Sequence, residues 1–372
     1  MTPIVKRVLQ QNELSGNKLS KRQLIGVEGM KRNNNKMLIS LSVAALSLGM
    51  ATVASAATLD EVKQRGNLNC GVNVGLSGFS SPDADGQWQG LDVETCRALS
   101  SAIFGDPDKV VFTPLTAKER FTALQSGEID VLARNTTWTA TRDNSLGLNF
   151  TTTTFYDGQG FMVSKDLGVS SLEDLGGASI CIQSGTTHEL NLADYFPSKG
   201  IEINTATFDT PDQTASGFAS GRCDVLTSDT SQLSALRLQL PEPDSVEIMT
   251  QLISKEPLGP VVRQGDDQWF NIVKWTVFAM VNAEELGVTS DNAEQMQSDP
   301  PNPQVARLLG GDGNYGEQLG LGNDWAYNIV SQVGNYGEVF EDTVGANSPL
   351  KISRGMNALW DQGGILYAPP IR

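Results

Sequence analysis

Two arginines stand eight residues apart in the stretch IDVLARNTTWTATRDN, residues 129–144, of an acidic chain. Arg134 ends an apolar run, and Arg142 closes a threonine cluster that begins near Thr137. A guanidinium can hold a carboxylate through two parallel hydrogen bonds, and Asn135 and the hydroxyls can satisfy the remaining lone pairs. We therefore predict an anion site centred on Arg142. Surface arginines beside capping threonines are the alternative, and for Arg134 that alternative fits equally well.

A second set of polar residues stands where later strands are expected to end. The stretch QSGTTHEL, residues 183–190, places Thr186 and Thr187 at a helix start, where exposed N–H groups and the helix dipole favour an anion. Asp229 ends RCDVLTSD and can hold an ammonium group. The alternatives are simple helix caps at both places. Together these residues describe partners for the two charged ends of an α-amino acid.

Other kinds of chemistry find less support. The single histidine, His188, has no evident Ser or Cys partner, and the four cysteines form no CxxC pair, so we expect neither a metal nor a cofactor. A net charge of −16 repels phosphate backbones, which argues against nucleic-acid binding. We therefore expect a binding protein that is not an enzyme. An enzyme that uses a Glu or Asp on a related acid stays open as an alternative, although no distinct general acid stands out.

Alternating strands and helices must position these side chains. Residues 67–134 read as β-α-β-α-β, with strands at NLNCGVNV, KVVFTPL and IDVLAR, which indicates a parallel sheet covered by helices. Asp92 is expected to cap the first of these helices, and Thr116 with Glu119 forms a capping box before the second.

The same pattern returns further along the chain. Extended stretches near 150–163 and 246–262 connect the two units, and helical pieces follow from about Ser298. We predict an α/β protein of two doubly wound lobes joined by two extended crossings, with a C-terminal helical extension. A ligand would lie between the lobes, at the carboxyl ends of the strands.

The first residues differ from the rest of the chain. Residues 1–56 carry eight Lys/Arg and two Asp/Glu, and the apolar run 37–50 is followed by the small residues ASA, which predicts a cleaved secretory signal peptide. A translation start at Met30 would explain the polar residues before it. The run is short for a membrane span, so an uncleaved anchor is the weaker alternative.

All four cysteines follow the predicted signal. An even number in an oxidising compartment predicts disulfide bonds. Their spacing favours the local pairs Cys70–Cys96 and Cys181–Cys223, with four buried free thiols as the alternative.

Several longer stretches resemble the periplasmic solute-binding proteins of the polar-amino-acid ABC uptake family. The resemblance covers most of residues 58–282 and is carried by TLDEVKQRGNLNCGV, GQWQGLDVETCRALSSAIFGD, RFTALQSGEIDVLARNTTWTATRD, SICIQSGTTHELNLADYF and FASGRCDVLTSDTSQLSALR. The run TRDNSLGLNFTTTTFYDGQGFMV is similar to the longer, general L-amino-acid-binding subgroup. This resemblance implies a type II periplasmic binding protein fold, an L-amino-acid ligand and delivery to an inner-membrane ABC permease. We expect a periplasmic monomer.

The resemblance also implies roles for single residues. Arg142 would clamp the α-carboxylate of the ligand, helped by Thr137, Thr187 and the backbone N–H groups at Thr186. Asp229 would bind the α-ammonium group, and a further residue, Asn135, would border this head group.

The sequence departs from shorter family members where the ligand side chain would lie. Leu76 stands where a stacking aromatic is common, with Phe79 further on, and Arg134 replaces a small hydroxyl residue. Gln183 and His188 also fall near this end. We hypothesise that Arg134 favours Glu, Asp, Gln or Asn as the ligand.

Three segments follow from these interpretations. We expect residues 1–56 to form the N-terminal extension and signal peptide, 57–152 with 258–372 to form lobe 1 and its C-terminal extension, and 153–257 to form lobe 2. Besides the enzyme, a ligand-sensing subunit is kept as an alternative function.

Overall fold

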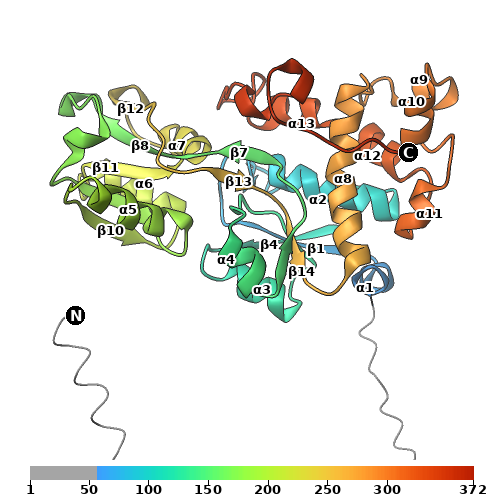
Figure 1. Ribbon diagram of the computed structural model, residues 1–372, viewed down its shortest axis with the longest axis horizontal. Helices are drawn as coiled ribbons and strands as arrows, with labels where there is room; N and C mark the ends of the chain where they lie inside the picture. The colour runs from blue at the N-terminus through green and yellow to red at the C-terminus, as the bar shows by residue number, and fades with distance from the viewer. Residues whose placement is uncertain (1–56) are drawn as a thin grey trace, which may run out of the picture. The chain divides into compact units, whose positions relative to one another are not determined.

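The computed structural model describes residues 57–372, so the predicted signal peptide at 1–56 lies outside the described residues. The described part contains two five-stranded sheets, joined by a two-stranded ladder (Figure 1). The predicted α/β class with two lobes is confirmed by these sheets and their flanking helices.

The sheet of lobe 1 has three parallel strands at one side and antiparallel strands at the other. In spatial order it contains β4 (Val110–Leu115), β1 (Leu68–Asn73), β5 (Val131–Leu132), β14 (Val261–Arg263) and β6 (Leu148–Phe150). Strand β1 runs parallel to both neighbours, as the β-α-β pattern predicts, whereas β14 pairs antiparallel with β5 and β6. The carboxyl ends of β1 and β5 therefore meet at one edge.

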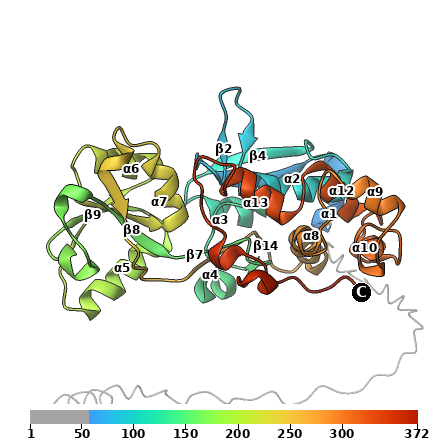
Figure 2. The same cartoon turned by 90° about the horizontal axis from the view of Figure 1, so that it is seen from above.

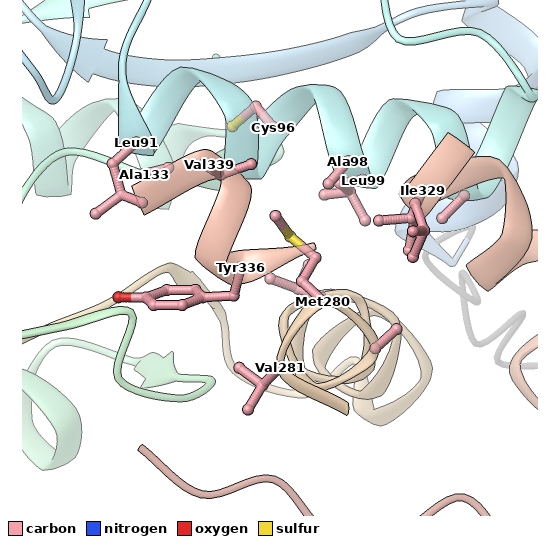
Figure 3. Close-up of a cluster of buried hydrophobic side chains, with 14 of the residues drawn as sticks. Leu91, Cys96, Ala98, Leu99, Ala133, Met280, Val281, Ile329, Tyr336 and Val339 are labelled. Atoms are coloured by element: carbon pink, nitrogen blue, oxygen red, sulfur yellow. The ribbon is translucent and has the colours of Figure 1, made fainter. Parts of the chain in front are cut away.

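Helices cover this sheet and build the largest core. They are α1 (Thr58–Arg65), α2 (Leu91–Phe104), α3 (Arg120–Ser126), α4 (Ala140–Ser145) and the long α8 (Asp267–Glu285). Leu99 of α2, Met280 of α8 and Ile329 of the C-terminal extension lie together in this core (Figure 3). A small hairpin of β2 (Ser81–Pro82) and β3 (Trp88–Gln89) precedes α2.

Lobe 2 repeats the arrangement. Its sheet order is β10 (Asn204–Phe208), β9 (Ser179–Gln183), β11 (Val225–Asp229), β8 (Gln159–Ser164) and β12 (Val246–Ile248). Strands β10, β9 and β11 are parallel, and β8 is antiparallel to both β11 and β12. The helices are α5 (Thr187–Ser198), α6 (Pro211–Ala219) and α7 (Thr230–Arg237), with short 3-10 turns at Lys165–Leu167, Leu172–Leu175 and Pro243–Ser245.

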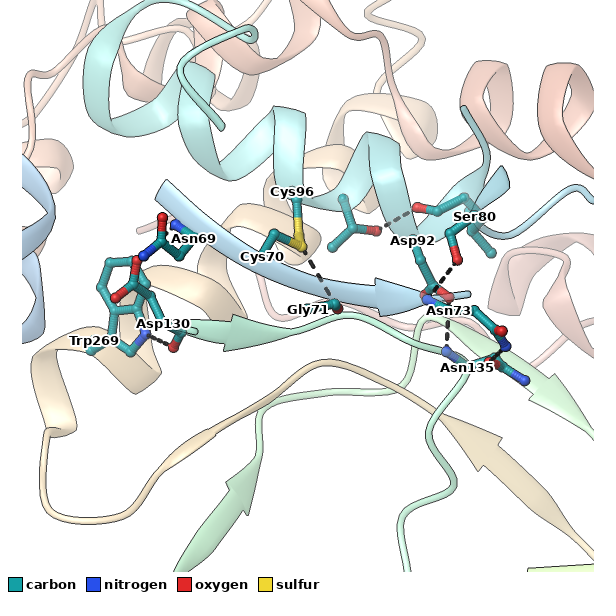
Figure 4. The surroundings of a disulfide bond; sticks show 12 residues. Asn69, Cys70, Gly71, Asn73, Ser80, Asp92, Cys96, Asp130, Asn135 and Trp269 are labelled. Carbon is teal, nitrogen blue, oxygen red and sulfur yellow. Dashed lines mark hydrogen bonds between the residues drawn. A yellow bond between two sulfur atoms is a disulfide. The ribbon is translucent and has the colours of Figure 1, made fainter. Parts of the chain in front are cut away.

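Each lobe contains one disulfide bond, and the predicted pairing is confirmed. Cys70 of β1 bonds to Cys96 of α2, and Cys181 of β9 bonds to Cys223 just before β11. Figure 4 shows the first bond between strand and helix. Both bonds join elements of the same lobe, so neither crosses between the lobes.

The two crossing segments form a short antiparallel ladder. Strand β7 (Phe155–Asp157) pairs with β13 (Glu256–Leu258), with Asp157 opposite Glu256. Figure 1 shows this ladder between the two sheets, and Figure 2 shows β7 between the lobes from above. We propose that the lobe boundaries at 152/153 and 257/258 lie at this ladder.

The C-terminal extension packs on lobe 1 and also reaches the crossing strand. Its helices are α9 (Ala293–Ser298), α10 (Pro303–Leu308), α11 (Tyr315–Leu319), α12 (Trp325–Gln332) and α13 (Tyr336–Thr343). The buried hydroxyl of Tyr336 donates to the carbonyl of Thr154 at 2.6 Å. Asn357 accepts from the N–H of Tyr156 at 2.6 Å and donates to its carbonyl at 3.1 Å.

Near its end, the extension contains two 3-10 turns, at Gly355–Asn357 and Trp360–Gln362. The helical pieces expected after Ser298 are thus reduced here to short turns, and the glycines beside them have positive φ angles, 50° at Gly355 and 89° at Gly363. Within residues 57–372, no helix is both long and apolar enough to cross a membrane.

Candidate functional site

The carboxyl ends of β1 and β5 form a buried polar corner. Asn135 adopts a left-handed φ of 34°, which is uncommon for a residue with a side chain. Its N–H donates to Asp92 at 2.7 Å, and its Oδ1 accepts from Asn73 at 3.0 Å (Figure 4). Asp92 was predicted to cap α2. Instead Gly90 precedes that helix, and the Asp92 carboxylate holds the strained turn at Asn135.

Three arginines come together beside this corner. Arg142, in α4, is half-buried and donates to the carbonyl of Thr137 at 2.9 Å. Arg134 is 2% exposed, and its Nε donates to the carbonyl of Leu115 at 2.8 Å. Sequence reasoning missed the third, Arg120, which is 2% exposed at the start of α3. The Thr116–Glu119 capping box, which the structure confirms, could have pointed to it by placing Arg120 near a strand end.

These guanidinium groups lack acidic partners in the part of the chain that the structure describes. Arg120 donates to the Thr136 hydroxyl at 3.1 Å, and both Arg120 and Arg142 lie over the ring of Phe121. Burial lowers the pKa of Arg134 to about 10, which leaves it charged at neutral pH. Burial, followed by the charges of Arg142 and Arg134, also lowers the pKa of Arg120. Buried, unpaired positive charges of this kind favour an anionic ligand.

Asp229 lies across from these arginines at the end of β11. It occupies the N-cap position of α7, yet its carboxylate makes no capping hydrogen bond. Asp157 of the crossing strand performs that task, since it accepts from the N–H groups of Thr230 and Ser231. The simple capping role for Asp229 is therefore excluded. The carboxylate is 3% exposed and contacts Nε2 of His188 at 3.0 Å.

A second carboxylate, Glu256 on β13, reaches the same place and was missed from the sequence. It is 1% exposed and accepts from the hydroxyl of Thr187 at 3.0 Å and from Asn191 at 2.8 Å. One ring nitrogen of His188 and one carboxylate oxygen each of Asp229 and Glu256 all lie within 4.8 Å of one another. The stretch SKEPLG around Glu256 gives no sign that this side chain is buried. Its burial arises only when the crossing strand packs against α5.

The charges on the two sides influence one another. Burial lowers the pKa of Arg142, and this effect is opposed first by Glu256 and then by Asp229. Burial disfavours a charge on His188, but Asp229 and Glu256 raise its pKa on balance. The site thus places a guanidinium close to a pair of carboxylates.

Thr186, Gln183 and Phe79, which were also predicted to contact the ligand, bond to or pack against other parts of the protein. Thr186 is at the N-cap of α5, but its hydroxyl donates to the carbonyl of Gln183 at 2.7 Å instead of capping the helix. The side-chain amide of Gln183 donates to the carbonyl of Asp209 at 3.1 Å. Phe79 is 1% exposed and packs edge-on against Phe155 in the lobe 1 core. This packing role is what the structure shows for Phe79, and its contact with a ligand stays a prediction.

Direct contacts link the lobes around the site. Asn135 donates to Gln232 of α7 at 3.1 Å, and Arg120 lies 3.5 Å from the carbonyl of Gly185. Gly185 has a φ of 75°, and a Cβ there would lie 3.2 Å from the backbone nitrogen of Lys118. Glycine is favoured here by the left-handed backbone, and a side chain would also crowd Lys118 of lobe 1.

Buried acids near the site make stability depend on pH. Burial raises the pKa of Asp92 to about 7, and burial with the charge of Asp229 raises that of Asp157 to about 6. A raised folded-state pKa means that folding takes up protons between the unfolded value near 4 and the folded value. The stabilisation is complete at low pH and is lost as pH rises through 6 to 7. We expect the melting temperature to rise from pH 8 to about pH 5.5.

The Asp92→Asn variant should show a weaker rise, since the amide oxygen still accepts from Asn135 but does not titrate. Thermal unfolding followed by circular dichroism at half-unit pH steps measures both slopes. The exposed Asp85→Asn variant is the matched control and should keep the wild-type slope. A melting temperature that falls steadily from pH 8 to 5.5 would contradict the expectation.

Two α/β lobes on a two-strand hinge, with facing charges between them, define a type II periplasmic binding protein fold. The chain belongs to the bacterial extracellular solute-binding proteins, family 3, whose family model matches residues 68–292.

Similar proteins cover nearly the whole chain. The general L-amino acid-binding periplasmic protein AapJ of Rhizobium johnstonii is 57% identical over 91% of this chain and 99% of its own length. The glutamate/glutamine/aspartate/asparagine-binding protein BztA of Rhodobacter capsulatus is 50% identical over 90% and 98%. A solved periplasmic binding protein from Brucella ovis with glutathione bound is 54% identical, has a TM-score of 0.83 and covers 85% of this chain and 100% of its own.

Proposed function

We propose that this protein captures L-amino acids in the periplasm and delivers them to an inner-membrane ABC importer. The observation that carries the proposal is the arrangement of unpaired arginines opposite two buried carboxylates, Asp229 and Glu256. An α-amino acid carries a carboxylate and an ammonium group on the same carbon atom, and these charges are complementary to the arginines and the acids of the site. The names of AapJ and BztA support the same ligand class.

The ligand preference that we propose is for Glu, Asp, Gln and Asn. Arg142 takes the α-carboxylate, which leaves Arg134 and Arg120 for a second acceptor group on the ligand. The Nη2 atom of Arg134 is buried and has no hydrogen-bond partner among the described residues. A side-chain carboxylate or amide oxygen would satisfy it.

Capture requires binding and closure only, so we propose no turnover. The lobes close about the β7–β13 ladder, and the closed form docks on the permease as a monomer.

The predicted signal peptide at residues 1–56 accounts for export. The alternatives are an enzyme on the same fold and a sensory subunit. Calorimetric titration with a panel of amino acids, with glutathione added because of the Brucella ovis protein, tests capture. Turnover of arogenate or prephenate would instead support the enzyme.

The Arg134→Met variant tests the preference while keeping most of the side-chain volume. We expect the Kd for L-glutamate and L-aspartate to rise about thirtyfold, since a buried charge–charge contact is lost. The Kd for L-leucine should change less than about threefold, because only the head group is shared. Calorimetry on one preparation gives all three values. Equal losses for acidic and neutral ligands would overturn the assignment of Arg134.

A further inference from the structure

Glu256 belongs to the hinge ladder rather than to the body of either lobe. Strand β13 pairs with β7 in this ladder and forms a single bridge to Thr137, and Glu256 stands opposite Asp157. Its side chain nevertheless points to lobe 2, where it accepts hydrogen bonds from Thr187 and Asn191 of α5. A third donor, the hydroxyl of Ser254, lies at 2.5 Å. These contacts fix both carboxylate oxygens in one orientation.

All three donors to Glu256 are neutral. In the chain from residue 57 onward, neither a lysine nor an arginine lies within ion-pair distance of it. A carboxylate that is 1% exposed and lacks a cation is costly to bury. Its neighbour Asp229 is also buried, and it has been relieved of helix capping by Asp157. Two acids therefore share one site, with a single histidine between them.

His188 cannot balance both acids. Its Nε2 lies 3.0 Å from Asp229, so even a protonated ring supplies one positive charge for two carboxylates. The group of His188, Asp229 and Glu256, taken without the nearby arginines, thus keeps a net negative charge when both acids are ionised. A small cation can contact all three groups at once, since their donor atoms lie within 4.8 Å of one another.

The charge of Arg142 favours the ammonium group of an amino acid over a metal ion at this site. It lies close enough to Glu256 and Asp229 for all three charges to interact. An isolated divalent metal would be repelled by this guanidinium, whereas an α-amino acid brings a carboxylate for Arg142 along with its ammonium group. An ammonium group also offers three N–H donors to the oxygens around it.

We propose that Glu256 is a specificity-determining residue that binds the ligand α-ammonium group together with Asp229. This inference rests on the proposed capture of amino acids and deepens it. Glu256 selects for an α-amino group, so it discriminates an amino acid from the acid of the same length that lacks nitrogen. The contact also forms on the hinge strand itself, which places the ligand nitrogen beside the axis of closure.

The Glu256→Gln variant tests the proposal with two ligands. L-Glutamate and glutarate share both carboxylates and differ in the ammonium group. We expect calorimetry to show a loss of about thirtyfold or more in affinity for L-glutamate, while glutarate binds as in wild type or tighter. The ratio of the two Kd values is the readout, because a purely structural defect would weaken both ligands alike.

Glu247→Gln, an exposed change on β12, is the matched control and should leave both Kd values unchanged. A Glu256→Gln variant with the wild-type ratio overturns the proposal even if wild type binds amino acids. Wild type that binds no amino acid instead overturns the proposed function, and this inference with it. A requirement for Ca²⁺, Mg²⁺ or Zn²⁺ after chelation would assign the group to a metal. A crystal structure with L-glutamate gives a second measurement, with the ligand nitrogen expected within hydrogen-bond distance of Glu256.

Discussion

Replacing Arg142 with methionine is expected to weaken the binding of every L-amino acid by about a hundredfold or more. Arg142 is half-buried, and its side chain makes one hydrogen bond within the protein, to the carbonyl of Thr137. Its removal should therefore cost little stability. The loss would fall on the ligand α-carboxylate, which is common to all candidates and would be left without its charged partner. Calorimetric Kd values for L-glutamate and L-leucine measure the effect.

Arg222→Met provides the matched control for this change. Arg222 is exposed on lobe 2 and lies over the ring of Phe208, and among the described residues it forms no ion pair with the acids of the site. We expect wild-type affinity from this variant. An Arg142→Met protein that keeps its affinity within threefold, while Arg120→Met loses binding, would transfer the α-carboxylate role to Arg120.

Removing the disulfide of lobe 2 should have the largest effect on stability. Cys181 and Cys223 are 42 residues apart, and a loop of that size contributes about 4 kcal/mol in the chain-entropy account of disulfides. Both cysteines are buried, so alanine also removes packing from the core around β9 and β11. Urea unfolding of the Cys181→Ala/Cys223→Ala protein should show a lower midpoint than wild type.

Reducing the disulfide bonds of wild type and of the double variant gives a second test of this contribution to stability. Dithiothreitol should lower the midpoint of wild type and change the double variant less, since only the Cys70–Cys96 bond then remains to be reduced. A midpoint that is identical in the double variant and in oxidised wild type would show that the bond contributes no net stability.

Much of the scaffold is predictable from local patterns. Alternating apolar residues identify β1, and Thr210-Pro211 identifies the start of α6, because these signals act over a few residues. Helix α13 was not predicted, although a capping box of Asn335 and Glu338 marks its start. Glycines around short helices of the extension obscure their periodicity.

The site is predictable only in part, for a physical reason. Asp229 ends β11, and Arg142 lies in α4, shortly after the end of β5. Topology brings such strand ends together, so the charges of both side chains interact. Arg120 and Glu256 stand in charged stretches that resemble exposed surface. Their burial arises from contacts over long sequence distances, such as Thr187 with Glu256 across 69 positions. The sequence contains no local signal for the contact of Glu256, whereas the capping box before α3 offers a weak one for Arg120.

The hydrogen bonds of Tyr336 and Asn357 to the crossing strand bear on how the two lobes move relative to each other. Their hydrogen bonds join Thr154 and Tyr156 to the C-terminal extension on lobe 1, so we expect the start of β7 to move together with that lobe. Bending must then begin at or beyond Asp157, where the strand passes to lobe 2. The pivot is thereby shifted toward the end of the strand that carries the helix-capping acid and faces Glu256. We therefore expect the C-terminal extension to determine where along β7 the hinge between the lobes lies.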